Sequence, residues 1–173
     1  MYTVNDCVFY KTVGICRITA IRAERIGRGE AQPCYVLKPV YNPNTTLYIP
    51  MEQDDLVRMM RPILTKEEIV NLISYMPDAE APWIENERDR GKDFYEKLQS
   101  CDAHEWIKII KALYQQKGTR KQASKAMNSI DSRIMTAAEK LLHEEFAFVL
   151  GIEPSAVLPY ILERIPPAAV CSR

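Results

Sequence analysis

The spacing of apolar and polar residues divides the chain into two parts with different periodicities. Over about the first sixty residues, short runs rich in β-branched and aromatic residues are separated by glycine, proline and asparagine, which is typical of strands and turns. From Thr65 onward, apolar residues recur every three or four positions, which is typical of helices. The pattern therefore predicts an α+β protein with a β-rich front part and an all-helical back part.

The front part contains several short apolar runs that we interpret as strands of one sheet. These runs are 7–10, 14–21, 34–41, 45–49 and, as a closing strand, 56–60. Pro39 lies inside the third run and favours an edge position or a bulge there, because proline lacks the N–H group that pairs with a neighbouring strand. Short strands at this density are typical of a small, strongly bent β-barrel of the SH3-like or Tudor-like type.

The back part carries helix-start and helix-stop signals as well as periodicity. Thr65 and Glu68 have the spacing of a capping box, in which each side chain binds the other residue's backbone N–H, and Asp102 with Glu105 repeats it. We predict helices over about 65–76, 84–99, 102–118, 129–150 and 154–165. The predicted domains are a barrel at 1–60, a compact all-α helical domain at 61–165 and a flexible tail at 166–173.

Charge and composition limit the classes of function. The 23 Lys and Arg residues balance the 23 Asp and Glu residues, so the formal net charge is zero. This balance argues against a polybasic coat, and any contact with nucleic acid must come from local clustering of cations. The five cysteines show no paired C-x-x-C spacing, and we find neither a signal-peptide pattern nor an apolar run of membrane-spanning length. We therefore expect a globular, reduced, cytoplasmic protein that does not contact membranes.

No motif in the sequence indicates catalysis or a metal centre. Cys101 and His104 have a metal-like spacing, but a second ligand pair is absent, and Asp102 between them is typical of a helix cap. Both histidines, His104 and His143, lie on predicted helices, and the sequence lacks a glycine-rich phosphate loop, a nucleophile elbow and an H-E-x-x-H motif. We therefore expect a protein that is not an enzyme and that binds no metal or cofactor.

Basic residues gather in one segment although the whole chain is neutral. Residues 106–130 contain no Asp or Glu, and their six cations are Lys108, Lys111, Lys117, Arg120, Lys121 and Lys125. Cations near the C-terminal end of a helix complement the helix dipole, which explains Lys111 and Lys117 without a ligand. The last three cations lie beyond Gly118, where that explanation is weaker, so we favour an anionic partner for this segment.

Trp83 follows Pro82 at the start of a predicted helix that also carries cations. A large apolar ring beside Arg88, Arg90 and Lys92 suits a wedge in a nucleic-acid groove, with the cations near phosphates. Arg88 and Lys92 are four positions apart and share one helix face. Packing of Trp83 in a core is an equally good interpretation of the residue type, and acids alternate with the cations in this stretch. Composition therefore leaves both roles of Trp83 open.

Two sets of short sequence pieces carry a resemblance to a known family. In the front part they are Val4-Asn5-Asp6-x-Val8-x-Tyr10, Val13-Gly14, Cys34-Tyr35-Val36-Leu37-Lys38 and Leu47-Tyr48-Ile49-Pro50. In the back part they are Pro82-Trp83-Ile84-Glu85-Asn86, Glu96-Lys97-Leu98-x-Ser100-x-Asp102 and Ala138-Glu139-Lys140-Leu141-Leu142-x-Glu144-Glu145. In this order, from about Tyr2 to Ile161, they resemble the CarD family of bacterial transcription regulators.

The resemblance implies a protein with two binding surfaces and no catalytic activity. In this family a Tudor-like front domain docks on the RNA polymerase β subunit, as the related domain of transcription-repair coupling factor does. The helical domain contacts promoter DNA just upstream of the melted region. A tryptophan that matches Trp83 wedges into the minor groove at the bubble edge, and nearby cations hold phosphates without reading sequence. The implied function is modulation of open-complex stability, by a chain that we expect to be a monomer.

The residues expected to make these contacts fall into two sets. Those expected to bind DNA are Trp83, Arg88, Arg90, Lys92, Lys117, Arg120, Lys121 and Lys125. Those expected to bind RNA polymerase are Arg25, Arg28, Thr46, Leu47, Tyr48, Ile49 and Pro50. Tyr48 stands where many relatives have a basic residue, so a charge contact with polymerase is lost or moves to Arg25 or Arg28. The stretch from Trp83 to Lys92 is longer than in some relatives, which leaves open which cation meets phosphate.

A protein–protein adaptor is the alternative function. In this interpretation the SH3-like or Tudor-like module binds a protein partner, and the helices only support it. The adaptor would make no DNA contact, so a salt-sensitive shift of forked or bubble DNA separates the two hypotheses.

Overall fold

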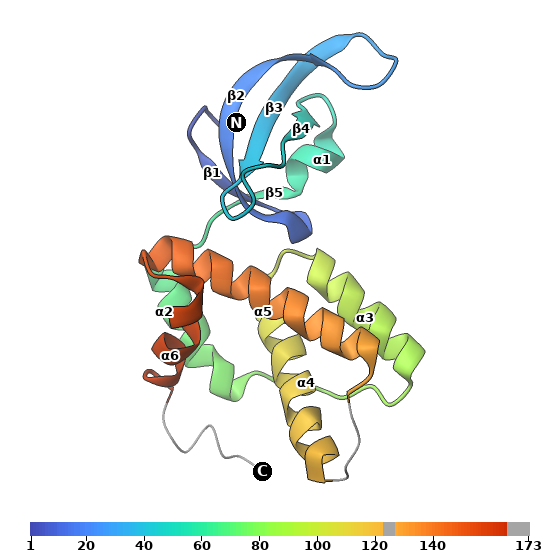
Figure 1. Ribbon diagram of the computed structural model, residues 1–173, viewed down its shortest axis with the longest axis vertical. Coiled ribbons are helices and arrows are strands. Elements are labelled where there is room, and N and C mark those ends of the chain that lie inside the picture. Colours follow the sequence, from blue (N-terminus) through green and yellow to red (C-terminus); the bar gives the residue numbers. More distant parts are fainter. Residues whose placement is uncertain (123–126, 166–173) are drawn as a thin grey trace. The chain divides into compact units, whose positions relative to one another are not determined.

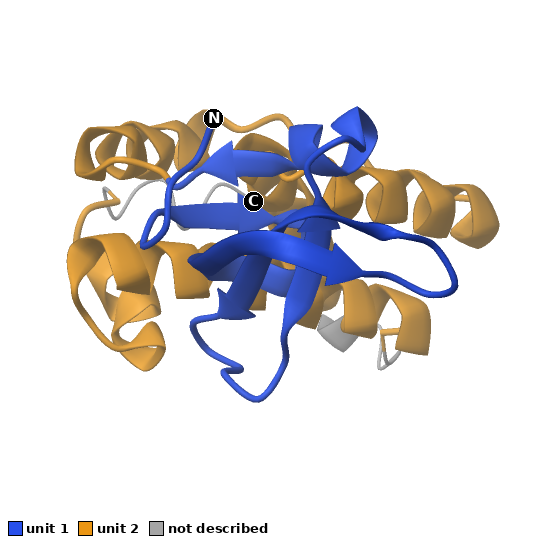
Figure 2. Cartoon of the chain, turned by 90° about the horizontal axis from the view of Figure 1, so that it is seen from above, with its two compact units in different colours: residues 1–63 blue, residues 64–173 orange. Residues whose placement is uncertain are grey.

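The computed structural model describes residues 1–122 and 127–165, and of residues 119–122 only the backbone (Figure 1). The chain divides into two compact units, Met1–Ile63 and Leu64–Arg173 (Figure 2). The strands lie in the first unit and the long helices in the second, which confirms the predicted α+β class. The expected tail at 166–173 and the cation Lys125 lie outside the described residues.

The first unit is built on an antiparallel sheet of five strands. The strands are β1 (Cys7–Tyr10), β2 (Gly14–Arg25), β3 (Ala31–Pro39), β4 (Leu47–Pro50) and β5 (Met60–Pro62). They lie in the order β4-β3-β2-β1-β5, and all neighbours are antiparallel. A 3-10 turn, η1 (Lys11–Val13), joins β1 to β2, and Gly14 follows it with a φ of 91°, a conformation that favours glycine.

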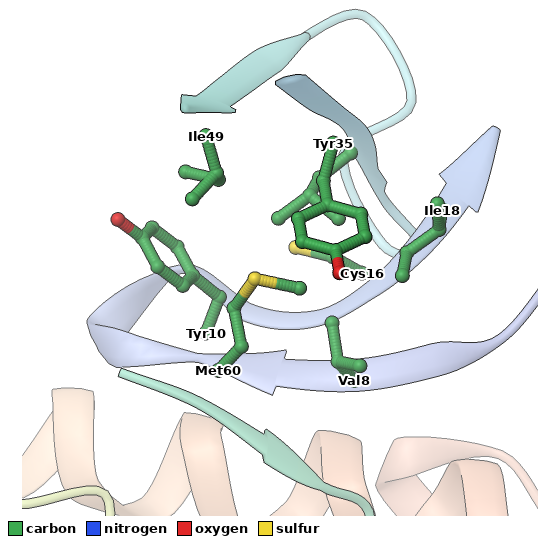
Figure 3. Packing of buried hydrophobic residues seen from close by; sticks show 8 residues of the cluster. Val8, Tyr10, Cys16, Ile18, Tyr35, Ile49 and Met60 are labelled. Atoms are coloured by element: carbon green, nitrogen blue, oxygen red, sulfur yellow. The ribbon is translucent and has the colours of Figure 1, made fainter. Parts of the chain in front are cut away.

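One hydrophobic cluster holds this unit together. Its buried members are Val8, Tyr10, Cys16, Ile18, Tyr35, Leu37, Ile49 and Met60. Figure 3 shows these side chains converging from different strands on one core. Ile49 lies on β4 and Met60 on β5, which are the two ends of the sheet order, so the sheet has to curl for both side chains to reach the same core.

The sheet is curled, but hydrogen bonds do not close it into a barrel within the described residues. The predicted fold class is therefore confirmed, and the structure corrects only the expectation that a strand at 56–60 closes the sheet. The expected strand at 56–60 is not formed over most of its length. Asp54–Arg58 forms the short helix α1 instead, and β5 begins only at Met60. Leu56 and Val57 pack against the core cluster from this helix, so their apolar character does not require a strand.

Pro39 lies at the end of β3, which is not an edge strand of the sheet. The paired register joins β4 only to Cys34–Leu37 of β3, so Pro39 stands at a local edge opposite Cys16 of β2. The irregularity in the register lies elsewhere, in β2 between Ile18 and Ala20. The missing N–H of Pro39 is therefore tolerated because no β4 residue pairs with it.

The second unit is helical in the described residues. Its elements are α2 (Lys66–Tyr75), the 3-10 turn η2 (Met76–Asp78), α3 (Glu87–Gln99), α4 (Ala103–Gln122), α5 (Ser129–Leu150) and α6 (Pro154–Leu162). Helix α5 is the common neighbour, since it contacts α2, α3, α4 and α6 (Figure 1). The predicted bounds of α5 are confirmed, and Gly151 ends it in the left-handed conformation with a φ of 71°.

One of the two predicted capping boxes is present. The Thr65 side chain accepts from Glu68 N at 3.2 Å, and Thr65 N donates to Glu68 Oε2 at 2.7 Å. At the second position Asp102 accepts from His104 N at 2.8 Å, but the Glu105 carboxylate accepts from Lys108 Nζ at 2.6 Å instead of turning back to the cap. The second box is therefore wrong, because Lys108 offers Glu105 a charged partner one helical turn away.

Three helix ends differ from those predicted. Helix α3 begins at Glu87 rather than near 84, because Asn86 caps it by accepting from the backbone N–H groups of Arg88 and Asp89. Helix α4 continues through Gly118 to Gln122, since a glycine inside a helix costs only about 1 kcal/mol relative to alanine. Helix α6 ends at Leu162 rather than at 165.

No single helix in residues 1–122 and 127–165 has both the length and the apolar character needed to cross a membrane. Only α5 and α6 together have them by length and composition, as a pair bent by 89°.

Candidate functional site

Trp83 lies in the segment between η2 and α3, and its indole is half-buried. The ring meets Phe94 of α3 edge to face, with ring centroids 6.5 Å apart and an interplanar angle of 68°. The guanidinium carbon of Arg90 lies over the same ring, 4.1 Å from its centroid. Trp83 is therefore neither a buried core residue nor a loose surface ring, because defined neighbours support it while part of it stays accessible.

Among the cations expected near DNA whose side chains are described, Arg90 is the most buried. Its exposed fraction is 1%, and its guanidinium forms an ion pair with Asp131 of α5, whose side chain is also 1% exposed. Nε donates to Asp131 Oδ1 at 3.1 Å and Nη2 donates to Asp131 Oδ2 at 2.8 Å. This two-pronged geometry leaves the Arg90 head group inside the helical unit, so we remove Arg90 from the residues proposed to contact phosphate.

The third guanidinium nitrogen holds the backbone beside Trp83. Arg90 Nη1 donates to the carbonyl oxygens of Ile84 at 2.8 Å and Glu85 at 3.3 Å, which follow Trp83 in the chain. Arg90 therefore contacts both the Trp83 ring, over which its guanidinium carbon lies, and the adjoining backbone, to which its Nη1 donates. The sequence predicted that Arg90 is a surface cation, but in the structure it is buried and contacts Trp83 and the backbone that follows it.

Asp131 was not among the residues that the sequence singled out. It lies in the first turn of α5, and its backbone N donates to Oδ1 of the cap residue Asn128 at 2.6 Å. A carboxylate in this position is favoured by the helix dipole as well as by its guanidinium partner. Asn128 and Asp131 have the spacing of a helix start, but nothing in the local sequence connects them with Arg90, which is 41 positions away.

Three of the expected DNA-binding cations have described side chains at the surface. Arg88 and Lys117 are exposed, and the Lys92 side chain is 79% exposed, with Glu96 Oε1 at 3.9 Å from its Nζ. A long pair between such exposed groups contributes little, so it does not hold Lys92 away from another anion. The side chains of Arg120 and Lys121, like Lys125, lie outside the description.

The acid-free segment of α4 is partly structural. Lys108 pairs with Glu105, and this hydrogen bond raises the pKa of Lys108. Lys111 Nζ donates to the carbonyl oxygens of Met76 at 3.3 Å and Pro77 at 2.6 Å. Lys111 of α4 thus caps the turn η2, which follows α2, with a positive charge. In the described part of this segment, Lys108 and Lys111 are therefore already bonded to protein groups. Fewer lysines are available to an external anion than the sequence suggests.

A groove of about 540 Å³ lies between α3 and α5. Its apolar walls include Tyr95, Leu98 and Ile130, and two cations, Lys92 and Arg133, line it as well. Arg133 is exposed and was not singled out by the sequence, because it lies outside both the Trp83 segment and the acid-free segment. Only the packing of α3 on α5 brings it beside Lys92.

The residues expected to bind polymerase separate into exposed and buried ones. Thr46, which directly precedes β4, and Tyr48 within β4 are exposed. Leu47 is partly exposed, and Ile49 and Pro50 are buried. Ile49 belongs to the core cluster, so its side chain serves the fold. In the paired register of the sheet, β4 has β3 as its neighbour and stands at the end of the order.

Arg25 and Arg28 are exposed but lie away from β4. Arg25 pairs with Ala31 near the tip of the β2–β3 hairpin, whereas the β4 register ends at Cys34 opposite Pro50. Three residues of strand separate Ala31 from Cys34, which is about 10 Å. A charge contact from either arginine would therefore involve a different part of a partner than the β4 edge does.

The Cys101–His104 neighbourhood has a local explanation. His104 Nδ1 lies 3.2 Å from Asp102 Oδ1, and the His104 ring meets Tyr75 edge to face at 5.1 Å. The described residues contain no group of three or more His, Cys, Asp or Glu side chains that could hold a metal ion.

A curled sheet with an end strand, followed by a helical unit with a supported half-buried indole and surface cations, defines a two-part binding protein. The model of the CarD-like/TRCF RID domain matches residues 2–64, and that of the CarD C-terminal domain matches residues 71–161. The chain belongs to the CarD family, which confirms the resemblance seen in the sequence.

The protein is therefore a transcription regulator of the CarD type, and this family consists of transcription factors without enzymatic activity. Its first domain is of the RNA polymerase-interacting type, which indicates RNA polymerase as a partner. No curated protein matches the chain.

Proposed function

We propose that the protein acts as a monomer that docks on the RNA polymerase β subunit through its first unit and places Trp83 in the minor groove at the upstream edge of the transcription bubble. The observation that carries this proposal is the state of Trp83, whose ring is half-buried, supported by Arg90 and Phe94, and flanked by exposed cations. The match to the RNA polymerase-interacting domain model supports polymerase as a partner, while the DNA contact rests on Trp83 and the cations near it.

The indole would act on the DNA as an apolar wedge. An apolar side chain that enters the minor groove fills the gap between partly unstacked bases and opposes closure of the duplex. Arg88, Lys92 and Lys117 would bind phosphates, and such contacts position a protein without reading the sequence. The result would be a change in the lifetime of the open complex that is similar at many promoters.

The polymerase contact would use β4 as an end strand. An extended partner segment can add to such a strand through main-chain hydrogen bonds, while exposed side chains such as Thr46 and Tyr48 provide specificity. Because the formal net charge is zero, affinity for free DNA would be low. Tethering to polymerase would then raise the effective concentration of Trp83 at the promoter.

The proposal is tested by Trp83→Ala in the full chain, with polymerase and a promoter fragment. We expect co-purification with polymerase to be unchanged and the open-complex half-life to shorten about ten-fold, since a ring stacked on a base is worth about 1–3 kcal/mol. Tyr114→Ala is the matched control, because Tyr114 is a 67% exposed aromatic residue on α4 outside the Trp83 site. Equal half-lives for the wild type and Trp83→Ala would refute the wedge.

The docking edge is tested separately by Tyr48→Asp, with Arg25→Glu and Arg28→Glu as variants of the hairpin tip. We expect Tyr48→Asp to weaken capture of the β subunit and the hairpin variants to show whether charge contributes. If Tyr48→Asp captures the β subunit normally, the proposed edge is wrong, and normal capture by the two arginine variants would remove Arg25 and Arg28 from the interface. If polymerase binds but forked DNA never shifts at low salt, the protein is an adaptor without DNA contact.

A further inference from the structure

The ion pair between Arg90 and Asp131 is unusual because it lies inside the helical unit. Both side chains are 1% exposed, and charged residues are rarely this buried unless they are paired. Removing two charges from water is costly, and well-packed apolar residues often stabilise a core as well or better. Folding alone therefore gives little reason for this pair at the base of the Trp83 segment.

The contacts of Arg90 indicate what the pair does. Its Nε and Nη2 are held by Asp131 of α5, and its Nη1 binds the backbone carbonyls of Ile84 and Glu85. Its guanidinium carbon lies over the Trp83 ring, 4.1 Å from the centroid. One rigid side chain thus connects α5, the backbone after Trp83 and the indole itself.

We infer that the Arg90–Asp131 pair is a positioning device that fixes the Trp83 indole in its presented orientation before DNA arrives. The inference rests on the proposed wedge only for its effect at the promoter, since the orientation of Trp83 in the free protein can be measured directly. Arg90 is a positioning residue because it acts through Trp83. Lysine could not replace it, because an ammonium group has neither the flat face nor the fork of donors.

Pre-ordering the indole explains why such a pair is retained. A large side chain that is already held in its bound orientation loses less conformational freedom when it binds. Asp131 neutralises the charge of Arg90, so the pair adds no net charge for phosphates to attract. The pair should therefore change the strength of the wedge and leave the salt dependence of DNA binding unaltered.

The test replaces both partners at once, with Arg90→Met and Asp131→Leu in the full chain. This double variant fills the space with apolar groups, so no buried charge is left unpaired. Asp93→Asn with Lys97→Met is the matched control, because it removes an ion pair of 2.8 Å from the same helix at half-exposed positions. Thermal unfolding is measured first for each protein.

The first readout is acrylamide quenching of tryptophan fluorescence. The chain has two tryptophans, and Trp106 is 0% exposed with its Nε1 bonded to Leu98 O, so quenching reports Trp83. We expect quenching to rise and the emission to shift to the red in the double variant and not in the control. Unchanged quenching in a folded double variant would overturn the inference.

The second readout is the open-complex half-life with polymerase. We expect a fall of about two- to ten-fold in the double variant, the range that corresponds to ordering one large side chain on binding. In a Trp83→Ala background the same double change should cause no further loss, because it acts through Trp83. A further loss there, or a salt slope reduced by about 1, would show that Arg90 contacts phosphate and would overturn the inference.

Arg90→Lys is the second variant, and it decides the matter if the double variant does not fold. It keeps the charge beside Asp131 but removes the flat support, so quenching should rise as in the double variant. Wild-type quenching in folded Arg90→Lys would overturn the inference. If Trp83→Ala leaves the half-life unchanged, the wedge fails, whereas the quenching result still decides whether the pair positions Trp83.

Discussion

Arg90 and Lys92 show how differently neighbouring cations on one helix can be used. Both lie early in α3, and by residue type both suit a phosphate contact. Two residues correspond to about 200° around a helix, so one side chain turns inward when the other turns outward. Arg90 is 1% exposed and paired with Asp131, while the Lys92 side chain is 79% exposed. The direction of a side chain, rather than its type, decides its role here.

A similar contrast among the cysteines predicts their reactivity. Burial, with a smaller contribution from Cys7, raises the pKa of Cys16 to about 12. Since the thiolate is the reactive form, Cys16 should resist alkylation in the folded protein near pH 8, whereas partly exposed Cys101 should react. Iodoacetamide labelling followed by peptide mass spectrometry measures both. In denaturant the two should label alike, and equal labelling in the native protein would contradict the prediction.

His143 on α5 predicts a pH dependence of stability. Burial lowers the pKa of His143 below its usual 6.5, although Glu139 acts in the opposite direction. Between the folded and unfolded pKa values the unfolded chain binds more protons, so the free energy of unfolding should decrease as the pH falls below the usual value. Urea unfolding of the wild type and of His143→Gln across this range measures the effect.

Neighbouring Glu144 has a contribution of opposite sign. Burial raises the pKa of Glu144 above 4.5, so its contribution is full below 4.5 and is lost as the pH rises through the folded pKa. Both proteins retain Glu144, so the difference between their stability curves isolates His143. A constant difference from neutral to mildly acid pH would contradict the prediction.

Among the helices, α2 and α3 show that an end is set by the side chain that caps it. Asn86 delays the start of α3 to Glu87, although the apolar and charged residues before it suited an earlier start. In α4 the residue type suggested an end that does not form, since the helix continues through Gly118 to Gln122. Local residue types predicted these helices, and their ends depended on hydrogen bonds that form only in the folded chain.

The capping box of α2 gives a prediction for that helix. Thr65→Ala removes the acceptor for Glu68 N and leaves a backbone donor at the helix start without it. We expect a loss of about 1 kcal/mol in the free energy of unfolding, the usual cost of losing a Ser or Thr cap. Thr65→Ser should retain most of the stability, because its hydroxyl can accept the same bond. Chemical denaturation of the three proteins provides the measurement, and equal stability of all three would contradict it.

For the whole molecule, the formal net charge is zero, so binding of DNA by the helical unit would depend on a few exposed cations. Arg88, Lys92 and Lys117 are the exposed cations of the proposed DNA set with described side chains. If all three bind phosphates, log K for forked DNA should fall with log salt with a slope of about −3. Replacing any one of them by alanine should reduce the slope by about 1, measured as affinity at several salt concentrations.

The matched control for this prediction is Lys111→Ala. Lys111 belongs to the same acid-free segment, but it donates to the carbonyls of Met76 and Pro77. Its loss should reduce stability and leave the salt slope unchanged. A slope near zero in the wild type would show that the helical unit does not bind DNA through phosphates.

The sequence by itself determined the division into strands and helices, the family, and the position of Trp83 shortly before a charged helix. These features depend on periodicity and on motifs of a few neighbouring residues, which the linear chain contains. Tertiary structure alone decided that the sheet stays open, that Lys111 caps another segment, and that Arg90 supports Trp83 instead of facing solvent. Each of these depends on a partner far along the chain, as Asp131 is 41 positions from Arg90. Local pattern carries no information about such a partner, because packing creates the contact.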